Sequence, residues 1–142
     1  FGVRSSEFGV RSSEFGVRNQ TIDPMNDLKQ RTKIFALNIV KFVEGLPRNG
    51  TTAVLGKQLL RSGTSVAANY RAACRGRSPA EFQAKMGIVE EEADESVLWL
   101  ELLIESGHAD PNHANPLRQE ADELTAIAVS SIRTSRGSQP KK

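Results

Sequence analysis

Cysteine and aromatic residues are scarce in this chain of 142 residues, which has one Cys, one Trp, one Tyr and six Phe. The single cysteine, Cys74, excludes an internal disulfide and a metal site built from several cysteines, and it favours a reducing compartment. Long apolar runs are also missing, because none reaches the roughly 18 residues of a membrane-spanning helix. The N-terminus lacks the apolar stretch of a signal peptide. We therefore expect a cytoplasmic protein with no membrane partner.

Motifs that would indicate catalysis are absent as well. The sequence contains no Walker phosphate-binding loop, no Gly-x-Gly-x-x-Gly turn and no Gly-x-Ser-x-Gly nucleophile motif. His108 and His113 lie close together in sequence, but neither follows a glutamate by three residues as in di-iron bundles. A metal site formed by both with Asp110 is the alternative. Cys74 has no histidine nearby in sequence to act as its base. We expect no enzymatic activity, no cofactor and no metal.

The first 18 residues repeat a seven-residue unit, Phe-Gly-Val-Arg-Ser-Ser-Glu. Its two apolar residues are only two positions apart, so the repeat cannot form the apolar seam of a coiled coil. We interpret residues 1–24 as a disordered, non-native extension, with native translation starting at Met25; a docking motif is the alternative. Residues 136–142 are polar and are predicted to form a flexible tail.

Between these ends, apolar residues recur at spacings of three and four in four segments, which predicts four helices. The segments are separated by a Gly-Leu-Pro turn at 45–47, by Gly76, and by Gly107 with the loop that follows it. Short connections place consecutive helices antiparallel. The sequence therefore predicts an all-α protein, an antiparallel up-down four-helix bundle in residues 25–135.

Several residues are suited to the ends of these helices. Ser78-Pro79-Ala80-Glu81 is the strongest signal, because Ser78 can accept from a free N–H group, Pro79 needs no donor at the first helical position, and Glu81 can complete a capping box. Elsewhere we expect an N-cap at Thr51 or Thr52, an N-cap at Asn112 or Asn115, Pro116 within a first turn, and a left-handed cap at Gly45.

The second predicted helix is unusually rich in small residues. An interior glycine costs about 1 kcal/mol relative to alanine, and a close helix–helix contact can offset that cost. We therefore expect a tight packing face around Gly63–Ala68.

Charge is segmented along the chain. Residues 57–85 contain six bases and one acid, whereas residues 86–105 contain seven acids and no base. On a helix, Lys57, Arg61, Arg71 and Arg75 fall on roughly one side, because their separations of 4, 10 and 4 are near multiples of 3.6. Such a face can bind nucleic-acid phosphates through counterion release; the alternatives are a solvated face or one paired with the acidic third helix. Tyr70 lies beside Arg71 and offers an aromatic ring for base stacking.

Two linked stretches carry a family resemblance. They are Arg61-Ser62-Gly63-Thr64-Ser65-Val66-Ala67-Ala68-Asn69 and Gly76-Arg77-Ser78-Pro79-Ala80-Glu81-Phe82. In these, in residues 87–107 and in the last amphipathic segment, the chain resembles the bacterial four-helix bundle proteins named after the 23S ribosomal RNA intervening sequences that encode some of them. The resemblance covers about residues 28–135. The basic end of the second helix, residues 69–74, departs from the commoner acidic version and indicates a subgroup.

The resemblance implies a fold, an assembly and a role. Relatives are similar to the accessory protein of diversity-generating retroelements, a pentameric barrel with a basic surface that binds reverse transcriptase and nucleic acid. The resemblance therefore implies a ring-like homo-oligomer, a homopentamer, with a non-catalytic binding role. It also implies RNA or a nucleic-acid-processing protein as partner. We expect an RNA-binding scaffold; a protein–protein interaction module without nucleic-acid contact is the alternative. The residues expected to contact phosphates are Lys57, Arg61, Arg71, Arg75 and Arg77.

Overall fold

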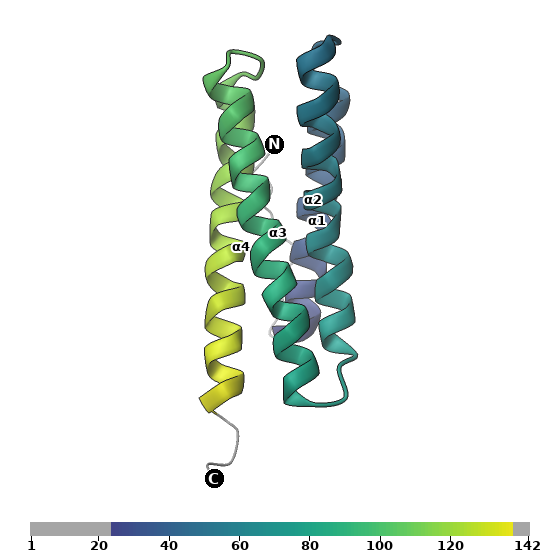
Figure 1. Cartoon of the computed structure of the whole chain (residues 1–142), viewed down its shortest axis with the longest axis vertical. Helices are drawn as coiled ribbons and strands as arrows, with labels where there is room; N and C mark the ends of the chain where they lie inside the picture. Colours follow the sequence, from purple (N-terminus) through teal and green to yellow (C-terminus); the bar gives the residue numbers. More distant parts are fainter. Residues whose placement is uncertain (1–23, 138–142) are drawn as a thin grey trace, which may run out of the picture.

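The protein is seen in a computed structural model that describes residues 24–137. The predictions for residues 1–23 and 138–142 lie outside the described residues. Within the described range every regular element is a helix, and there is no strand, so the all-α prediction is confirmed. The elements are α1 (Pro24–Glu44), α2 (Gly50–Cys74), α3 (Pro79–Glu105) and α4 (Pro111–Gly137), and Figure 1 shows them side by side. The predicted bundle was residues 25–135. α1 begins one residue before that range, and α4 continues two residues beyond it, into the segment predicted to be a flexible tail.

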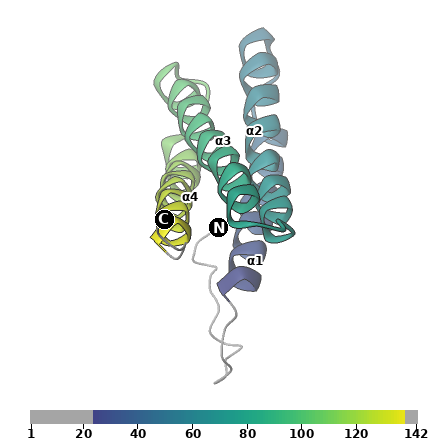
Figure 2. The same cartoon turned by 60° about the horizontal axis from the view of Figure 1, so that its bottom comes forward.

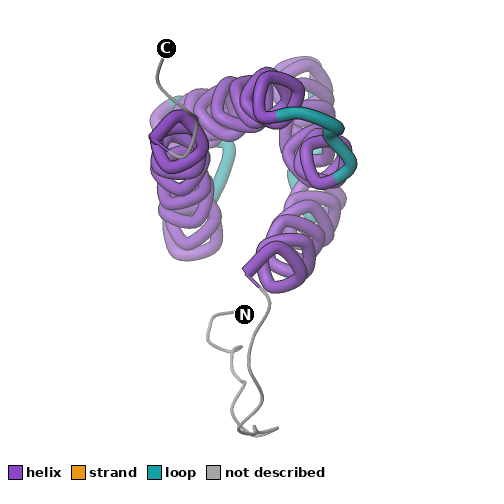
Figure 3. Tube along the Cα trace, turned by 90° about the horizontal axis from the view of Figure 1, so that it is seen from below, coloured by secondary structure: helices purple, strands orange, loops and turns teal. Residues whose placement is uncertain are grey.

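Helices that follow one another in the chain pack against one another. α3 makes extensive contacts with both α2 and α4, and α1 packs mainly on α2. α1 and α4 make the smallest contact, so the helices follow one another in an arc that is least closed between the first and the last (Figures 2 and 3). The four-helix bundle expected from the short loops is therefore present, and α2 and α3 lie in the middle of the arc.

The core is mainly aliphatic, as the scarcity of aromatics predicts. Leu59, Leu100 and Leu103 are completely buried. On α1, Phe35 and Ile39 are buried to the same degree, at 1% exposure or less. Full burial of such a side chain contributes about 1.5–3 kcal/mol relative to exposure. Leu100 and Leu103 are three residues apart and Phe35 and Ile39 are four apart, so the core is built from the periodic positions read in the sequence.

The small residues of α2 allow close contacts with both neighbours. A Cβ atom built at Gly63 would lie 2.9 Å from Cγ1 of Ile39 on α1, closer than real side chains pack. On the other side, the hydroxyls of Ser62 and Ser96 are 2.8 Å apart in the buried contact between α2 and α3. The predicted tight packing face is confirmed at Gly63, whereas Ala68 at its end is exposed.

The start of α2 differs from the expectation. Its N-cap is Asn49, whose Oδ1 accepts the backbone N–H of Thr52 at 3.0 Å, and the Thr52 hydroxyl lies 3.2 Å from the Asn49 backbone N. Neither Thr51 nor Thr52 is the cap itself. The threonine instead occupies the third helical position of a capping box, a role usually filled by Glu or Gln.

The start of α3 agrees with the sequence in its main feature. The Ser78 hydroxyl accepts the N–H of Glu81 at 3.1 Å, and Pro79 occupies the first helical position. The Glu81 carboxylate accepts from the backbone N–H of Arg77, at 2.8 Å. This donor is one residue before the Ser78 N–H that a capping box would use. Both interactions stabilise the same helix end.

Three further expectations about helix ends were wrong. Gly45 is not left-handed, since the only glycine with positive φ in residues 24–137 is Gly107, after α3. At the start of α4 the capping side chain is that of Asp110, which accepts the N–H of Asn112 at 2.9 Å, so the helix begins before Asn112 and Asn115. Pro116 consequently lies beyond the first turn and removes one backbone hydrogen bond within α4.

Candidate nucleic-acid interface

The outward side of α2 carries the basic residues identified from the sequence. Its inward side is defined by Leu59, Val66 and Tyr70, which are 3% exposed or less. The opposite side carries the exposed basic side chains of Lys57, Arg61 and Arg71, and Arg75 is exposed at the C-cap of the helix; these four residues are here called the α2 basic face. Arg77, the fifth predicted residue, is exposed in the connection between α2 and α3, just beyond the end of this face.

Arg61 differs from the rest of the α2 basic face because it is bound to α3. Its Nη1 lies 3.1 Å from Oε1 of Glu92, and its Nη2 donates to the Glu95 carboxylate. Glu95 also accepts from the Trp99 indole N–H at 3.4 Å. Arg61 is therefore paired with the acidic third helix, which was one of the alternatives to phosphate binding, because two carboxylates already compensate its charge.

The other four basic residues have no such compensation. In residues 24–137 no ion pair involves Lys57, Arg71, Arg75 or Arg77, and α2 itself contains no acidic residue. Lys57 and Arg75 are separated by about 27 Å along the helix at 1.5 Å per residue. The sequence periodicity thus located an extended cationic surface in which one residue, Arg61, one turn from the Lys57 end, is internally paired.

Tyr70 does not belong to this surface. It is only 3% exposed and packs in the core, so base stacking between Tyr70 and a nucleic acid, suggested by its position next to Arg71, is wrong. The helical period explains this result, because residues 66 and 70 are four apart and share the inward side.

The metal site considered for His108, His113 and Asp110 is not formed in the described part of the chain. No group of three or more His, Cys, Asp and Glu side chains is placed to hold a metal there. His108 Nδ1 lies 2.8 Å from the Ser106 hydroxyl, and His113 Nδ1 lies 3.9 Å from an Asp110 carboxylate oxygen. The two histidines therefore have separate local partners. Asn69 is also locally satisfied, donating to the Ser65 carbonyl at 2.9 Å.

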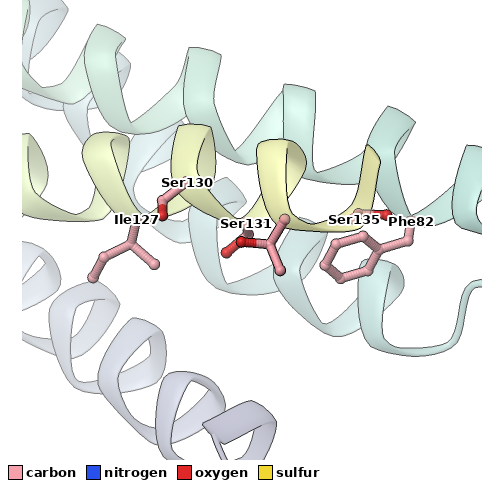
Figure 4. Close-up of a pocket in the computed structure, with 6 residues that line it drawn as sticks. Phe82, Ile127, Ser130, Ser131 and Ser135 are labelled. Carbon is pink, nitrogen blue, oxygen red and sulfur yellow. The ribbon is translucent and has the colours of Figure 1, made fainter. Parts of the chain in front are cut away.

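A shallow pocket of about 380 Å³ lies along the C-terminal half of α4 (Figure 4). Phe82 and Ile127 supply its apolar side chains, and the rest of its lining is hydroxylic. The Ser135 hydroxyl accepts from the Gln83 amide at 3.0 Å, which joins α4 to α3. No charged residue lines the pocket, and its residues are Phe82, Ile127, Ser130, Ser131, Thr134 and Ser135.

The polar contact between α1 and α4 was missed by the sequence analysis. Arg31 Nε donates to Glu120 at 2.7 Å, and its Nη2 donates to Glu120 at 2.8 Å and to Glu123 at 2.6 Å. The hydrogen-bonded Glu120 carboxylate raises the pKa of Arg31 above its ordinary value, although burial acts in the opposite direction. Nothing in the local sequence signals a pair separated by about ninety residues.

Comparison with known proteins agrees with this architecture. A sequence model described as 23S rRNA-intervening sequence protein matches residues 25–130. Among solved structures, the chain is similar to a Bacteroides thetaiotaomicron protein of unknown function from the S23 ribosomal protein family. The two share 34% sequence identity and superpose with a TM-score of 0.71, over 77% of this chain and 97% of the other. No curated protein matches the chain. None of the helices in residues 24–137 is long and apolar enough to cross a membrane.

Proposed function

This chain belongs to the 23S rRNA-intervening sequence protein family, and from that premise we propose that it is a non-catalytic, RNA-binding scaffold. It acts in the cytoplasm as a ring-like homo-oligomer, a homopentamer, and binds RNA through the α2 basic face together with Arg77. A scaffold of this kind requires an accessible binding surface rather than an enclosed reaction centre.

The observation that supports RNA binding is the exposed, uncompensated charge on α2. Lys57 and Arg71 are exposed on a helix without acids, Arg75 is exposed at its C-cap, and none of the three has an internal ion pair in the described residues. A phosphate backbone that approaches this surface therefore need not displace a carboxylate. Release of condensed counterions from the nucleic acid then provides the driving force, independent of base sequence.

The experiment is RNA binding measured at several salt concentrations. Each of Lys57→Ala, Arg71→Ala and Arg75→Ala is expected to weaken binding and to reduce the slope of log K against log salt by about one. Arg61→Ala is expected to change the slope less, since Glu92 and Glu95 already hold that guanidinium. Arg118→Ala on α4 is the matched control for loss of one charge. An unchanged slope in all three α2 variants, or no binding at low salt, would contradict the proposal.

The second candidate is a protein–protein interaction module. It is favoured by large apolar side chains that remain exposed on the helices, such as Val54 on α2 at 62%. Partner capture that persists at high salt, with no RNA bound at low salt, would favour this module over the RNA-binding scaffold. The salt dependence separates the two because apolar contacts are not screened by salt.

A further inference from the structure

Two helices expose pairs of large apolar side chains on the sides that face away from the core. Five large hydrophobic residues are exposed in the described part of the chain, and four of them form two pairs. Ile34 and Leu37 on α1 are 53% and 50% exposed, and Leu98 and Leu102 on α3 are 46% and 39% exposed. Single exposed apolar residues are ordinary, but pairs on one helix face indicate contact surfaces.

The α1 outer face consists of Gln30, Ile34, Leu37 and Lys41. Their spacings of four, three and four place them along one side of α1, and all four are exposed. Lys33 is exposed next to this line and adds a second positive charge. The two acids of α1, Asp27 and Glu44, lie at its first and last turns. The middle of this face is therefore apolar and basic.

The α3 outer face consists of Glu91, Leu98 and Leu102, which are seven and four residues apart and are all exposed. Asp94 and Glu105 are exposed along its edge, and residues 86–105 contain no base. Arg61 of α2 is the base that approaches this helix, and it is engaged by Glu92 and Glu95. The α3 outer face is therefore apolar and acidic.

These two faces cannot cover each other within one chain. α1 and α3 do not pack against each other, and each turns its buried side toward the common core. α1 and α3 occupy different parts of the arc (Figure 3), and their exposed sides lie opposite their buried sides, so the two outer faces are separate surfaces. Two separate, complementary surfaces on one chain are what a head-to-tail contact between copies requires.

We propose that the α1 outer face of one copy binds the α3 outer face of a second copy. The two faces match in length, since residues 30–41 and 91–102 each span about 16 Å at 1.5 Å per residue. They also match in character, with an apolar pair at the centre and opposite charges around it. Lys33 and Lys41 of one copy would face Glu91 and Asp94 of the next.

Like-to-like pairing of these faces is disfavoured by charge. Two α1 outer faces would bring lysines together, and two α3 outer faces would bring carboxylates together, which costs free energy in a desolvated contact. A head-to-tail contact leaves one unused face at each end of a dimer, so further copies can add until a ring closes. This inference rests on the self-assembly in the proposed function and identifies the surfaces responsible.

The test uses two double variants of the full chain, Ile34→Glu/Leu37→Glu and Leu98→Glu/Leu102→Glu. By sedimentation equilibrium, each variant alone is expected to be monomeric where the unaltered chain is oligomeric, with self-association at least about tenfold weaker. An equimolar mixture of the two is expected to form a 1:1 dimer. In that mixture the intact α3 outer face of one variant can bind the intact α1 outer face of the other.

The matched control is Gln119→Glu/Ala126→Glu, which adds two acids to exposed positions of α4 and is expected to retain the unaltered mass. Circular dichroism verifies that every variant keeps its helices. A mixture that remains monomeric, either face variant that keeps the unaltered mass, or an unaltered chain that is monomeric throughout would overturn the proposal. RNA binding measured on the monomeric variants separates this result from the RNA proposal, because their α2 basic face is intact.

Discussion

At the scale of single residues, the two helical glycines Gly63 and Gly87 have opposite roles. Gly63 faces α1, where a Cβ atom would lie 2.9, 3.0 and 3.2 Å from Cγ1, Cγ2 and Cβ of Ile39. Ile39 is β-branched and fully buried, so it has little freedom to turn away. Around Gly87, a Cβ atom would meet nothing within 4 Å. One glycine is thus required by packing, and the other only lowers helix stability.

Alanine substitutions at these glycines should therefore change stability in opposite directions. Gly63→Ala is expected to lower the free energy of unfolding by about 1–2 kcal/mol, because the overpacking cost exceeds the gain in helix propensity. Gly87→Ala is expected to raise it by about 0.5–1 kcal/mol. Urea unfolding followed by circular dichroism measures both, and a stabilising Gly63→Ala would show that α1 does not approach α2 as described.

At the scale of elements, the helices are delimited by side chains that satisfy free backbone groups. Asn49, Ser78 and Asp110 accept from the first turns of α2, α3 and α4. Gly107 follows the end of α3 with φ of 82°, a left-handed conformation that is unfavourable for residues with a side chain. The connections are consequently short, which brings the acidic α3 directly beside the basic α2.

Removal of the α3 cap tests this local contribution. Ser78→Ala is expected to lower the free energy of unfolding by about 1 kcal/mol, because the N–H of Glu81 loses its acceptor at the exposed helix start. Ser106→Ala at the other end of α3 is the control, since its hydroxyl contacts the Leu103 carbonyl at 3.4 Å and His108 Nδ1 at 2.8 Å and accepts from no N–H group at the start of a helix. Equal losses for the two variants in urea unfolding would contradict the capping role.

At the scale of the whole molecule, Arg31 joins the first helix to the last. α1 and α4 pack least extensively of the neighbouring pairs, and Arg31 binds Glu120 and Glu123 across that contact. Because the hydrogen bond to Glu120 raises the pKa of folded Arg31, the arginine's contribution is fully present below its ordinary pKa. It is lost only as pH rises through strongly alkaline values, so Arg31 itself introduces no pH dependence near neutrality.

Arg31→Ala is accordingly expected to act on one part of the bundle. It should lower the free energy of unfolding by about 1 kcal/mol, because the site is partly exposed but the guanidinium binds two carboxylates. Amide hydrogen exchange should accelerate in α1 more than in α3. Arg133→Ala on α4, an exposed arginine without an ion pair in the described residues, is the control. Uniform acceleration across all helices would contradict a local role.

The sequence by itself determined the helices, their inward sides and the basic side of α2. Periodicity of three and four places Leu59, Val66 and Tyr70 inward, and it places Lys57 and Arg75 outward, because helical geometry relates sequence spacing directly to direction. Caps were less predictable. Several polar residues near each helix start can accept the same N–H groups, which is why Asn49 and Asp110 served in place of the expected threonines and asparagines.

Only the tertiary structure decided which side chains meet across helices. It joined Arg61 to Glu92 and Glu95, placed Gly63 on Ile39, and linked Arg31 to residues about ninety positions later. It also left Ile34, Leu37, Leu98 and Leu102 uncovered, although α1 and α3 were each recognisable as amphipathic. The physical reason is that local spacing sets the direction of a side chain, whereas its partner depends on how helices distant in sequence are aligned and how far they are offset.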